Sequence, residues 1–257
     1  MVFLCVLPGL CSMGIADNIA RVRERIVAAA VHAGREPSDI TLMAVSKTFP
    51  PEEIAEAHAA GLRVFGENRV QEFAGKIAGL RRLAGAEWHL IGHLQSNKAS
   101  KAAELFDAMD SVDSLKLAEK LNHAAGMLGK KLRVLIEVNV GGEAAKSGVA
   151  PDSAELEAIL SAAPRLGNLE ILGLMAIPPL TEDPQGARPY FRRLRELRGA
   201  IAARRLPGVS MEVLSMGMSH DFVVAVEEGS TCVRVGTAIF GERHKAQPQG
   251  THSGTGE

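Results

Sequence analysis

The stretch Thr41-Leu-Met-Ala-Val-Ser-Lys47 is an apolar run that ends in a lysine, and Thr48-Phe-Pro-Pro51 follows it directly. The run predicts a short buried β-strand that the prolines stop. A lysine at the mouth of a buried strand loses hydration, so we expect its pKa to fall toward the range where a neutral amine attacks a carbonyl. The alternative is a lysine whose ammonium reaches solvent along an apolar stem.

Similar apolar runs recur along the chain and alternate with amphipathic stretches. Strands are expected at 41–46, 63–66, 87–92, 108–112, 133–140, 169–176, 211–215 and 232–235. Helices are expected at 51–60, 70–83, 97–105, 115–128, 152–162 and 186–204. Apolar strands separated by helices predict a parallel sheet covered on its outer face, and eight units make a closed (β/α)8 TIM barrel. An open doubly wound sheet is the alternative, but no GxGxxG follows an early strand.

Composition excludes several classes of protein. The 257 residues are 46% hydrophobic and carry a formal net charge of −1, which suits one large core and no nucleic-acid or membrane surface. The chain has 3 cysteines without metal-ligand spacing. These features predict a reduced, cytoplasmic protein without a structural metal.

The two ends of the chain differ from the middle. Residues 1–16 begin with an apolar run that lacks a basic start and a cleavage site, so we expect a disordered extension or a misassigned start. Asp17 is expected to cap an additional N-terminal helix over 17–33. The barrel is predicted over 17–243, and the Gly- and Gln-rich residues 244–257 are expected to be disordered.

Polar and glycine residues gather where the predicted strands end, at 65–72, 92–98, 139–148, 215–221 and 234–241. The carboxyl ends of the strands form the active face of a barrel, and phosphate often binds after strands seven and eight. Glycines there expose backbone N–H groups to an anion. The residues that supply this chemistry are Ser215, Ser219, Gly236 and Thr237.

Several of these segments together resemble the pyridoxal phosphate homeostasis protein family. They are Ala44-Val-Ser-Lys-Thr48, Phe65-Gly-Glu-Asn-Arg69, Trp88-His-Leu-Ile-Gly-His-Leu-Gln-Ser-Asn-Lys98, Gly173-Leu-Met-Ala-Ile177, Leu214-Ser-Met-Gly-Met-Ser219 and Arg234-Val-Gly-Thr-Ala-Ile-Phe-Gly241. The resemblance runs from about residue 17 to residue 243. It implies a single barrel like the N-terminal domain of alanine racemase, of fold type III, that holds, buffers or delivers pyridoxal 5′-phosphate (PLP) without established turnover.

The resemblance also implies roles for single residues. Lys47 matches the lysine that forms a Schiff base with the cofactor aldehyde, and Asn68 matches an asparagine that approaches the cofactor. Ser215, Ser219, Gly236 and Thr237 fall in the phosphate-holding segments. Arg234 matches the position that faces the pyridine nitrogen. A guanidinium keeps its proton and donates a hydrogen bond, so that nitrogen stays unprotonated and the ring is a weaker electron sink.

Each assignment has a structural alternative. Arg234 would then only close an ion pair across the barrel mouth, and Gly236 would only form a helix-start turn. Ser215 and Ser219 would cap the following helix. His89 and His93 share a strand face, but we interpret them as hydrogen-bonded groups and assign no metal. Glu67 and Glu72 are expected at a helix N-terminus or in a surface pair.

Lys146 lies in the glycine-rich loop after the fifth predicted strand. As a second amine near the barrel mouth, it would receive the aldehyde from Lys47 by transimination during release. A solvated loop lysine is the alternative.

Two enzyme classes are rivals to the carrier. An amino-acid racemase of this fold needs a second base on the other face of the cofactor, a tyrosine from a further domain. The sequence ends soon after the eighth strand, and its tyrosine, Tyr190, matches no such position. A Schiff-base aldolase explains a lysine and a phosphate site but does not require Arg234. PLP-dependent apoenzymes are the expected acceptors, and the self-contained site favours a monomer.

Overall fold

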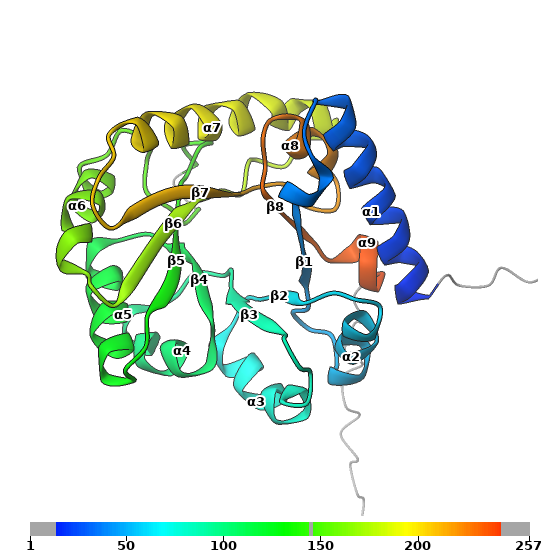
Figure 1. Cartoon of the computed structure of the whole chain (residues 1–257), viewed down its shortest axis with the longest axis horizontal. Coiled ribbons are helices and arrows are strands. Elements are labelled where there is room, and N and C mark those ends of the chain that lie inside the picture. The colour runs from blue at the N-terminus through cyan, green and yellow to red at the C-terminus, as the bar shows by residue number, and fades with distance from the viewer. Residues whose placement is uncertain (1–13, 144–145, 243–257) are drawn as a thin grey trace, which may run out of the picture.

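Eight parallel strands form a closed barrel in the computed structural model, which describes residues 14–143 and 146–242. Each strand pairs with the next in sequence, and helices surround the sheet (Figure 1). The eighth strand closes on the first with Thr41 opposite Cys232 and Met43 opposite Arg234. This closure confirms the predicted (β/α)8 barrel, because an open doubly wound sheet has no pairing between its first and last strands.

The element bounds agree closely with the periodicity of the sequence. The strands are β1 Thr41–Val45, β2 Val64–Glu67, β3 Glu87–Leu90, β4 Ala108–Val112, β5 Leu132–Glu137, β6 Leu169–Met175, β7 Val209–Ser215 and β8 Cys232–Val235. The α-helices are α1 Ile15–His32, α2 Pro51–Ala59, α3 Val70–Leu80, α4 Ala99–Leu105, α5 Leu115–Met127, α6 Ala154–Ala162, α7 Arg188–Ala203, α8 Phe222–Glu227 and α9 Thr237–Phe240. The 3₁₀ turns are η1 Pro37–Asp39, η2 Ser96–Lys98, η3 Ala163–Arg165 and η4 Pro184–Ala187.

Three local expectations were wrong. Helix α1 begins at Ile15 with Gly14 at its N-cap, so Asp17 lies in the first turn, where its charge favours the helix dipole. Strand β5 ends at Glu137, three residues earlier than expected, because the chain leaves the strand there. Helix α8 was not among the helices expected by residue range. Its sequence Phe-Val-Val-Ala-Val-Glu is rich in β-branched residues, which favour strands, so tertiary packing sets its conformation.

The predicted ends of the chain fall mostly outside the described residues. Residues 1–13, within the expected extension 1–16, and residues 243–257, which include the expected tail 244–257, are not described. Within the described part, no helix combines the length and the apolar character needed to cross a bilayer.

The outward strand faces and the inner helix faces form one continuous hydrophobic core. Its largest side chains include an aromatic group between β2, β3, α3 and α4. Phe65 and Phe73 each lie 5.0 Å from Trp88 between ring centroids, and Phe73 lies 4.6 Å from Phe106. Aromatic contacts at these separations contribute about 0.5–1.5 kcal/mol each beyond the burial of apolar area.

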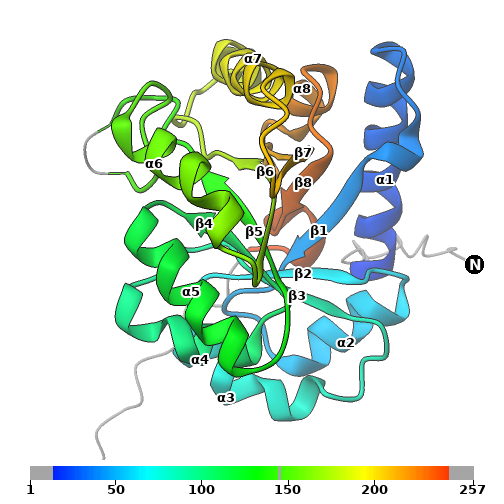
Figure 2. The same cartoon turned by 60° about the vertical axis from the view of Figure 1, so that its left-hand side comes forward.

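Helix α1 covers the seam where the barrel closes. Figures 1 and 2 show it on the outside of the barrel, near α8 and the β1–β8 edge. Asn18 Nδ2 donates to the carbonyl of Ile239 in α9 (2.8 Å), and the Arg25 guanidinium lies 4.6 Å from the centroid of the Phe222 ring of α8. The first helix therefore fixes the elements on either side of β8.

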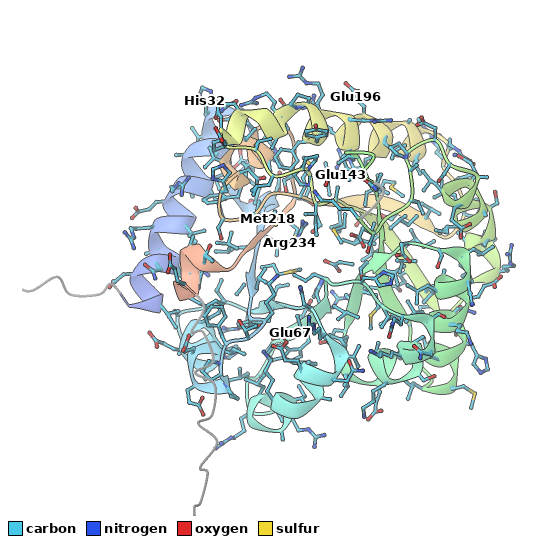
Figure 3. The ribbon with its side chains drawn as sticks, turned by 180° about the vertical axis from the view of Figure 1, so that it is seen from behind. His32, Glu67, Glu143, Glu196, Met218 and Arg234 are labelled. Carbon is cyan, nitrogen blue, oxygen red and sulfur yellow. The ribbon has the colours of Figure 1, made fainter. Side chains whose placement is uncertain are left out.

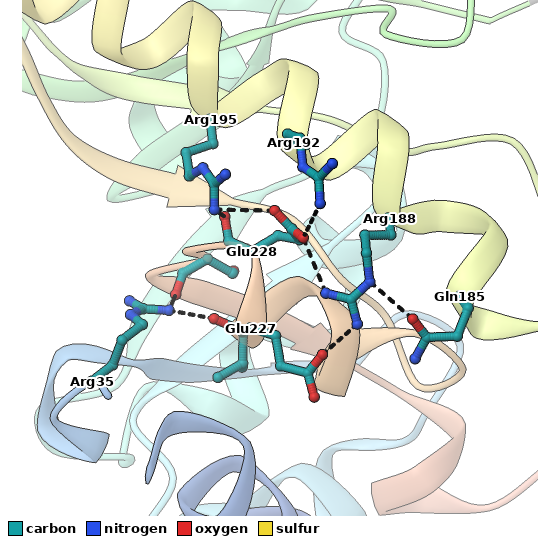
Figure 4. Close-up of polar contacts among 9 residues, drawn as sticks. Arg35, Gln185, Arg188, Arg192, Arg195, Glu227 and Glu228 are labelled. Carbon is teal, nitrogen blue, oxygen red and sulfur yellow. Dashed lines mark hydrogen bonds and ion pairs between the residues drawn. The ribbon is translucent and has the colours of Figure 1, made fainter. Parts of the chain in front are cut away.

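An arginine cluster fixes α7 against the chain before β8 (Figure 4). Glu228, whose side chain is 5% exposed, lies 3.0 Å from Arg188, 3.2 Å from Arg192 and 3.0 Å from Arg195. Burial raises the pKa of this carboxyl, but the arginines outweigh burial and the net pKa is lowered. Arg188 also pairs with Glu227. The segment that leads into β8 is thus held from outside the barrel.

Gly173 in β6 gives a test of the sheet. The β6–β7 register shifts between Ile171 and Gly173, and a Cβ at Gly173 would lie 1.8 Å from the carbonyl oxygen of Val213. The added methyl group would clash with backbone atoms, and no side-chain rotation can relieve such a clash. We therefore expect Gly173→Ala to lower the free energy of unfolding by about 3 kcal/mol. The control is Gly199→Ala in α7, where nothing lies within 4 Å and alanine should stabilise the helix. Urea unfolding of both variants measures the difference, and equal stabilities would contradict the close approach.

Candidate functional site

A cavity of about 500 Å³ opens at the carboxyl ends of the strands. It brings together every predicted site residue except Ser215, drawn from the ends of β1, β2, β7 and β8. These residues are Lys47, Asn68, Ser219, Arg234, Gly236 and Thr237. In Figure 3, Arg234 and Met218 lie toward the middle of the barrel, whereas His32 and Glu196 lie on the outer helices.

Ser215 lies beneath the cavity and holds Arg234. The serine is fully buried, and its Oγ accepts a hydrogen bond from Arg234 Nη1 (2.8 Å). Ser215 ends β7 opposite Cys232 and does not line the cavity. A direct phosphate contact by Ser215, expected from the sequence, does not fit this position.

Arg234 is itself a buried cation, with 2% of its surface exposed. Its Nη2 donates to the carbonyl of Ala176 (2.9 Å), and within the described residues no carboxylate lies at ion-pair distance from it. The ion pair considered as its alternative role is therefore absent from this part of the chain. Burial lowers the pKa of Arg234, while nearby acidic groups raise it. A guanidinium has five N–H donors, so donors remain for a ligand.

Ser219 organises the start of α9. Its Oγ lies 3.3 Å from the N–H of Gly236 and 3.4 Å from that of Ala238, and accepts from both. Ser219 therefore binds N–H groups at the start of a helix, as the capping alternative expects. The helix is α9, however, and not α8, which follows Ser219 in the sequence. The hydroxyl of Ser219 and the backbone of Gly236 and Thr237 thus meet at one side of the cavity, where an anion needs donors.

Asn68 is placed by a close approach of two backbones. A Cβ at Gly92 would lie 2.3 Å from the carbonyl oxygen of Asn68, so glycine is required where the chain leaves β3. This contact holds the end of β2 against the end of β3, with Asn68 on the cavity wall.

Glu137, at the end of β5, also lines the cavity and was not singled out from the sequence. Its side chain is buried, and its Oε2 has no hydrogen-bond partner. Burial and Asp113 raise the pKa of Glu137 to about 7, while Arg234 and His93 act to lower it. The sequence did contain a signal for this residue. Glu137 is the single acidic residue in the apolar run of β5, and the two-residue period of a strand places it on the same face as Arg133 and Leu135.

The two histidines on the β3 segment are hydrogen-bonded groups, as interpreted from the sequence. His89 Nδ1 lies 2.9 Å from Asp110 Oδ1, and His93 Nδ1 lies 3.0 Å from Asp113 Oδ2. The two histidines line different cavities. His93 lines the candidate site, and His89 lines the cavity at the opposite end of the barrel. In residues 14–143 and 146–242, no cluster of three or more His, Cys, Asp or Glu side chains is placed to hold a metal ion.

Glu67 and Lys146 differ from their expected surroundings. Glu67 is fully buried and pairs with Lys76 (2.9 Å), so it is neither a surface nor a helix-terminal group. Lys146 lines the cavity, and its Nζ bonds to Glu143 Oε1 (2.9 Å) and to the carbonyl of Pro178 (3.1 Å). It is therefore partly held at the rim instead of being a fully solvated loop lysine.

The residues present fit PLP. The cavity has the size of a small-molecule site and offers an amine at Lys47 for an aldehyde. It also offers a buried guanidinium at Arg234 for a ring acceptor and N–H and hydroxyl donors near Ser219 for a phosphate. When bound, this cofactor supplies an electrophilic aldehyde and an electron-accepting ring.

Comparison with known proteins supports the same assignment. The family model for the N-terminal domain of alanine racemase matches residues 15–244. The pyridoxal phosphate homeostasis protein of Aquifex aeolicus is 47% identical over 90% of this chain and 99% of that protein. The protein of the same name from Escherichia coli K12 is 45% identical over 89% of this chain and 97% of that one.

Solved structures agree on the fold. PipY of Synechococcus elongatus, whose structure has PLP bound, is 40% identical with a TM-score of 0.77, covering 88% of this chain and all of PipY. Alanine racemase of Streptomyces coelicolor is 22% identical with a TM-score of 0.66, covering 88% of this chain and 58% of the racemase, and shows a shared barrel. The chain belongs to the pyridoxal phosphate homeostasis protein family.

Proposed function

We propose that this protein binds PLP as a Schiff base on Lys47 and holds it for intracellular PLP homeostasis, buffering or delivering the cofactor. The observation that carries the proposal is the single cavity that joins Lys47 of the β1 end to Arg234 and Gly236 of the β8 end. Relatives named for PLP homeostasis, and the PLP-bound structure of PipY, support the choice of ligand.

Each residue has a defined task in this function. Lys47 contributes the Nζ lone pair to a new C=N bond and its two amine protons to the water that leaves. The N–H groups near Ser219 hold the phosphate, and Arg234 donates to the ring nitrogen. Because the guanidinium keeps its proton, it does not strengthen the ring as an electron sink, which suits storage of the cofactor.

The absence of turnover is part of the proposal. The relatives carry the name of a homeostasis protein and not of an enzyme. A racemase needs a second base facing the cofactor. Tyr190 packs against the hydrophobic core on α7, and no tyrosine lines the cavity in the described part of the chain. We further propose that the protein acts in the cytoplasm, as a monomer, with PLP-dependent apoenzymes as acceptors.

Covalent attachment is the first test. We expect the purified protein with PLP to show a near-visible absorption band that borohydride abolishes, with the reduced adduct on Lys47 by peptide mass spectrometry. Lys47→Ala should remove the adduct and weaken PLP binding roughly 100-fold. The control is Lys131→Ala, an exposed lysine before β5. A wild-type protein that is not modified at Lys47 would contradict the proposal.

Glu137 should make stability depend on pH. With an ordinary pKa of 4.5 and a folded pKa of about 7, its carboxyl keeps a proton that the unfolded chain releases. The stabilisation is complete below the unfolded pKa and is lost as pH rises through about 7. A shift of this size corresponds to roughly 3 kcal/mol.

Glu137→Gln cannot ionise and measures that contribution. We expect the variant to gain stability relative to wild type between about pH 5 and about pH 8, in urea unfolding without ligand. A constant difference across this range would show that Glu137 is ionised throughout.

Lys146 tests the route of release. If its amine takes the aldehyde from Lys47 by transimination, Lys146→Ala should slow PLP dissociation and transfer to an acceptor apoenzyme by about tenfold. Lys131→Ala serves again as the control. Unchanged dissociation and transfer rates would leave Lys146 as a rim group that only bonds Glu143 and Pro178.

A further inference from the structure

The turn that carries Lys47 has a strained backbone. Thr48, the next residue, has a φ of 67°. Left-handed φ values are disfavoured for residues with a Cβ, and more so for a β-branched threonine. Such a conformation persists where the surrounding contacts fix it, and it is often found beside functional groups.

Side chains of α3 bind the peptide groups on both sides of Lys47. Glu72 Oε1 accepts the N–H of Thr48 at 2.6 Å. Lys76 Nζ donates to the carbonyl of Ser46 at 3.0 Å and to that of Phe49 at 3.4 Å. The turn is therefore held before and after the lysine by two residues one helical turn apart.

Lys76 is anchored in turn by a buried acid. Its Nζ lies 2.9 Å from Glu67 Oε1 and 3.5 Å from Glu72 Oε1. The Glu67 side chain is fully buried, and Ser46 Oγ donates to the same Oε1 at 2.6 Å. Burial raises the pKa of Glu67, with Lys76 and Ser46 acting to lower it. A buried ion pair is a poor source of net stability, which points to a role in positioning.

We propose that Glu67, Glu72 and Lys76 form a clamp that directs the Lys47 amine into the cavity and so sets how readily PLP becomes covalently attached. The inference rests on the proposed function. None of the three residues lines the cavity, so they act through the turn as positioning residues. Attachment is sensitive to their loss because a small displacement of a reacting group slows a reaction steeply.

The clamp should affect the covalent step and leave the other contacts intact. In the proposed function the phosphate and ring contacts come from Ser219, Arg234 and Gly236, which line the cavity at the ends of β7 and β8, and not from the β1 turn. A clamp variant should therefore weaken binding only when Lys47 is present to attach. A general loosening of the barrel would instead weaken binding with or without Lys47.

A double-mutant cycle between Glu72 and Lys47 separates these outcomes. Glu72→Ala should slow formation of the near-visible band and weaken PLP affinity about tenfold in the presence of Lys47. In the Lys47→Ala background the same change should alter affinity by less than about twofold. Glu72→Gln keeps an acceptor oxygen for Thr48 and should restore most of the attachment rate. Glu104→Ala, in an exposed pair on α4, is the matched control.

The proposal is overturned if Glu72→Ala has the same effect in both backgrounds, or no effect in either. Lys76→Met is a second variant, expected to slow attachment at least as much, because it removes both carbonyl contacts. Should it fail to fold, the Glu72 cycle still decides. A wild-type protein that borohydride does not modify at Lys47 overturns the proposed function and the clamp together, whereas a failure confined to the variants overturns the clamp alone.

Discussion

The pairing of β1 with β8 is the constraint on which the site depends. Lys47 and Arg234 come from opposite ends of the described chain, and only closure of the barrel brings them together. The register sets Met43 against Arg234 and Ala44 against Val235. A Cβ at Gly236 would then lie 3.4 Å from the Cβ and carbonyl oxygen of Val45, in ordinary contact. A slip of two residues would move the lysine roughly 7 Å from its partners.

The β7–β8 seam is built differently, and this difference places the side of the cavity that carries Ser219. In the regular ladder these strands pair only at Ser215 and Cys232. Flanking groups hold the rest: Thr231 Oγ1 accepts the N–H of Leu214 (2.8 Å), and Gly217 O accepts the N–H of Arg234 (2.9 Å). Gly217 has a φ of 93°, which lets the chain turn there toward the cavity. Because the β7–β8 ladder ends at Ser215, the segment that carries Ser219 lies outside the sheet.

The architecture could be predicted from the sequence, because apolar runs bounded by glycine and proline residues mark the successive strand–helix units of the barrel. The motifs at the strand ends also placed most of the cavity residues. The roles of Ser215 and Glu67 could not be read in this way. A shift of one residue in a strand turns its side chains to the other face, so the sequence alone does not tell whether a polar side chain at a strand end lines the cavity. Glu137 stands out locally as an acidic residue in an apolar run, but only the closed barrel shows that its Oε2 lacks a hydrogen-bond partner.

The barrel interior separates the candidate site from the opposite end of the barrel. An apolar layer that includes Met43, Ile91 and Cys232 crosses the barrel. Gly66 permits it, since a Cβ there would lie 2.9 Å from Met43 Sδ and 3.0 Å from Ile91 Cδ1. Burial raises the pKa of the Cys232 thiol to about 12, so this layer stays uncharged at neutral pH.

The layer divides two cavities of similar size. At the amino-terminal end, burial lowers the pKa of His89, but Asp110 and Glu87 outweigh it and raise that pKa to about 9. There His89 pairs with Asp110, although His89 Nε2 and Asp110 Oδ2 have no hydrogen-bond partner among the described residues. At the other end, Arg234 bonds only neutral partners, and Glu137 Oε2 has none. A buried cation without an ion-pair partner is costly, and Arg234 is such a cation at the carboxyl end, which supports the proposal that an anionic ligand binds there.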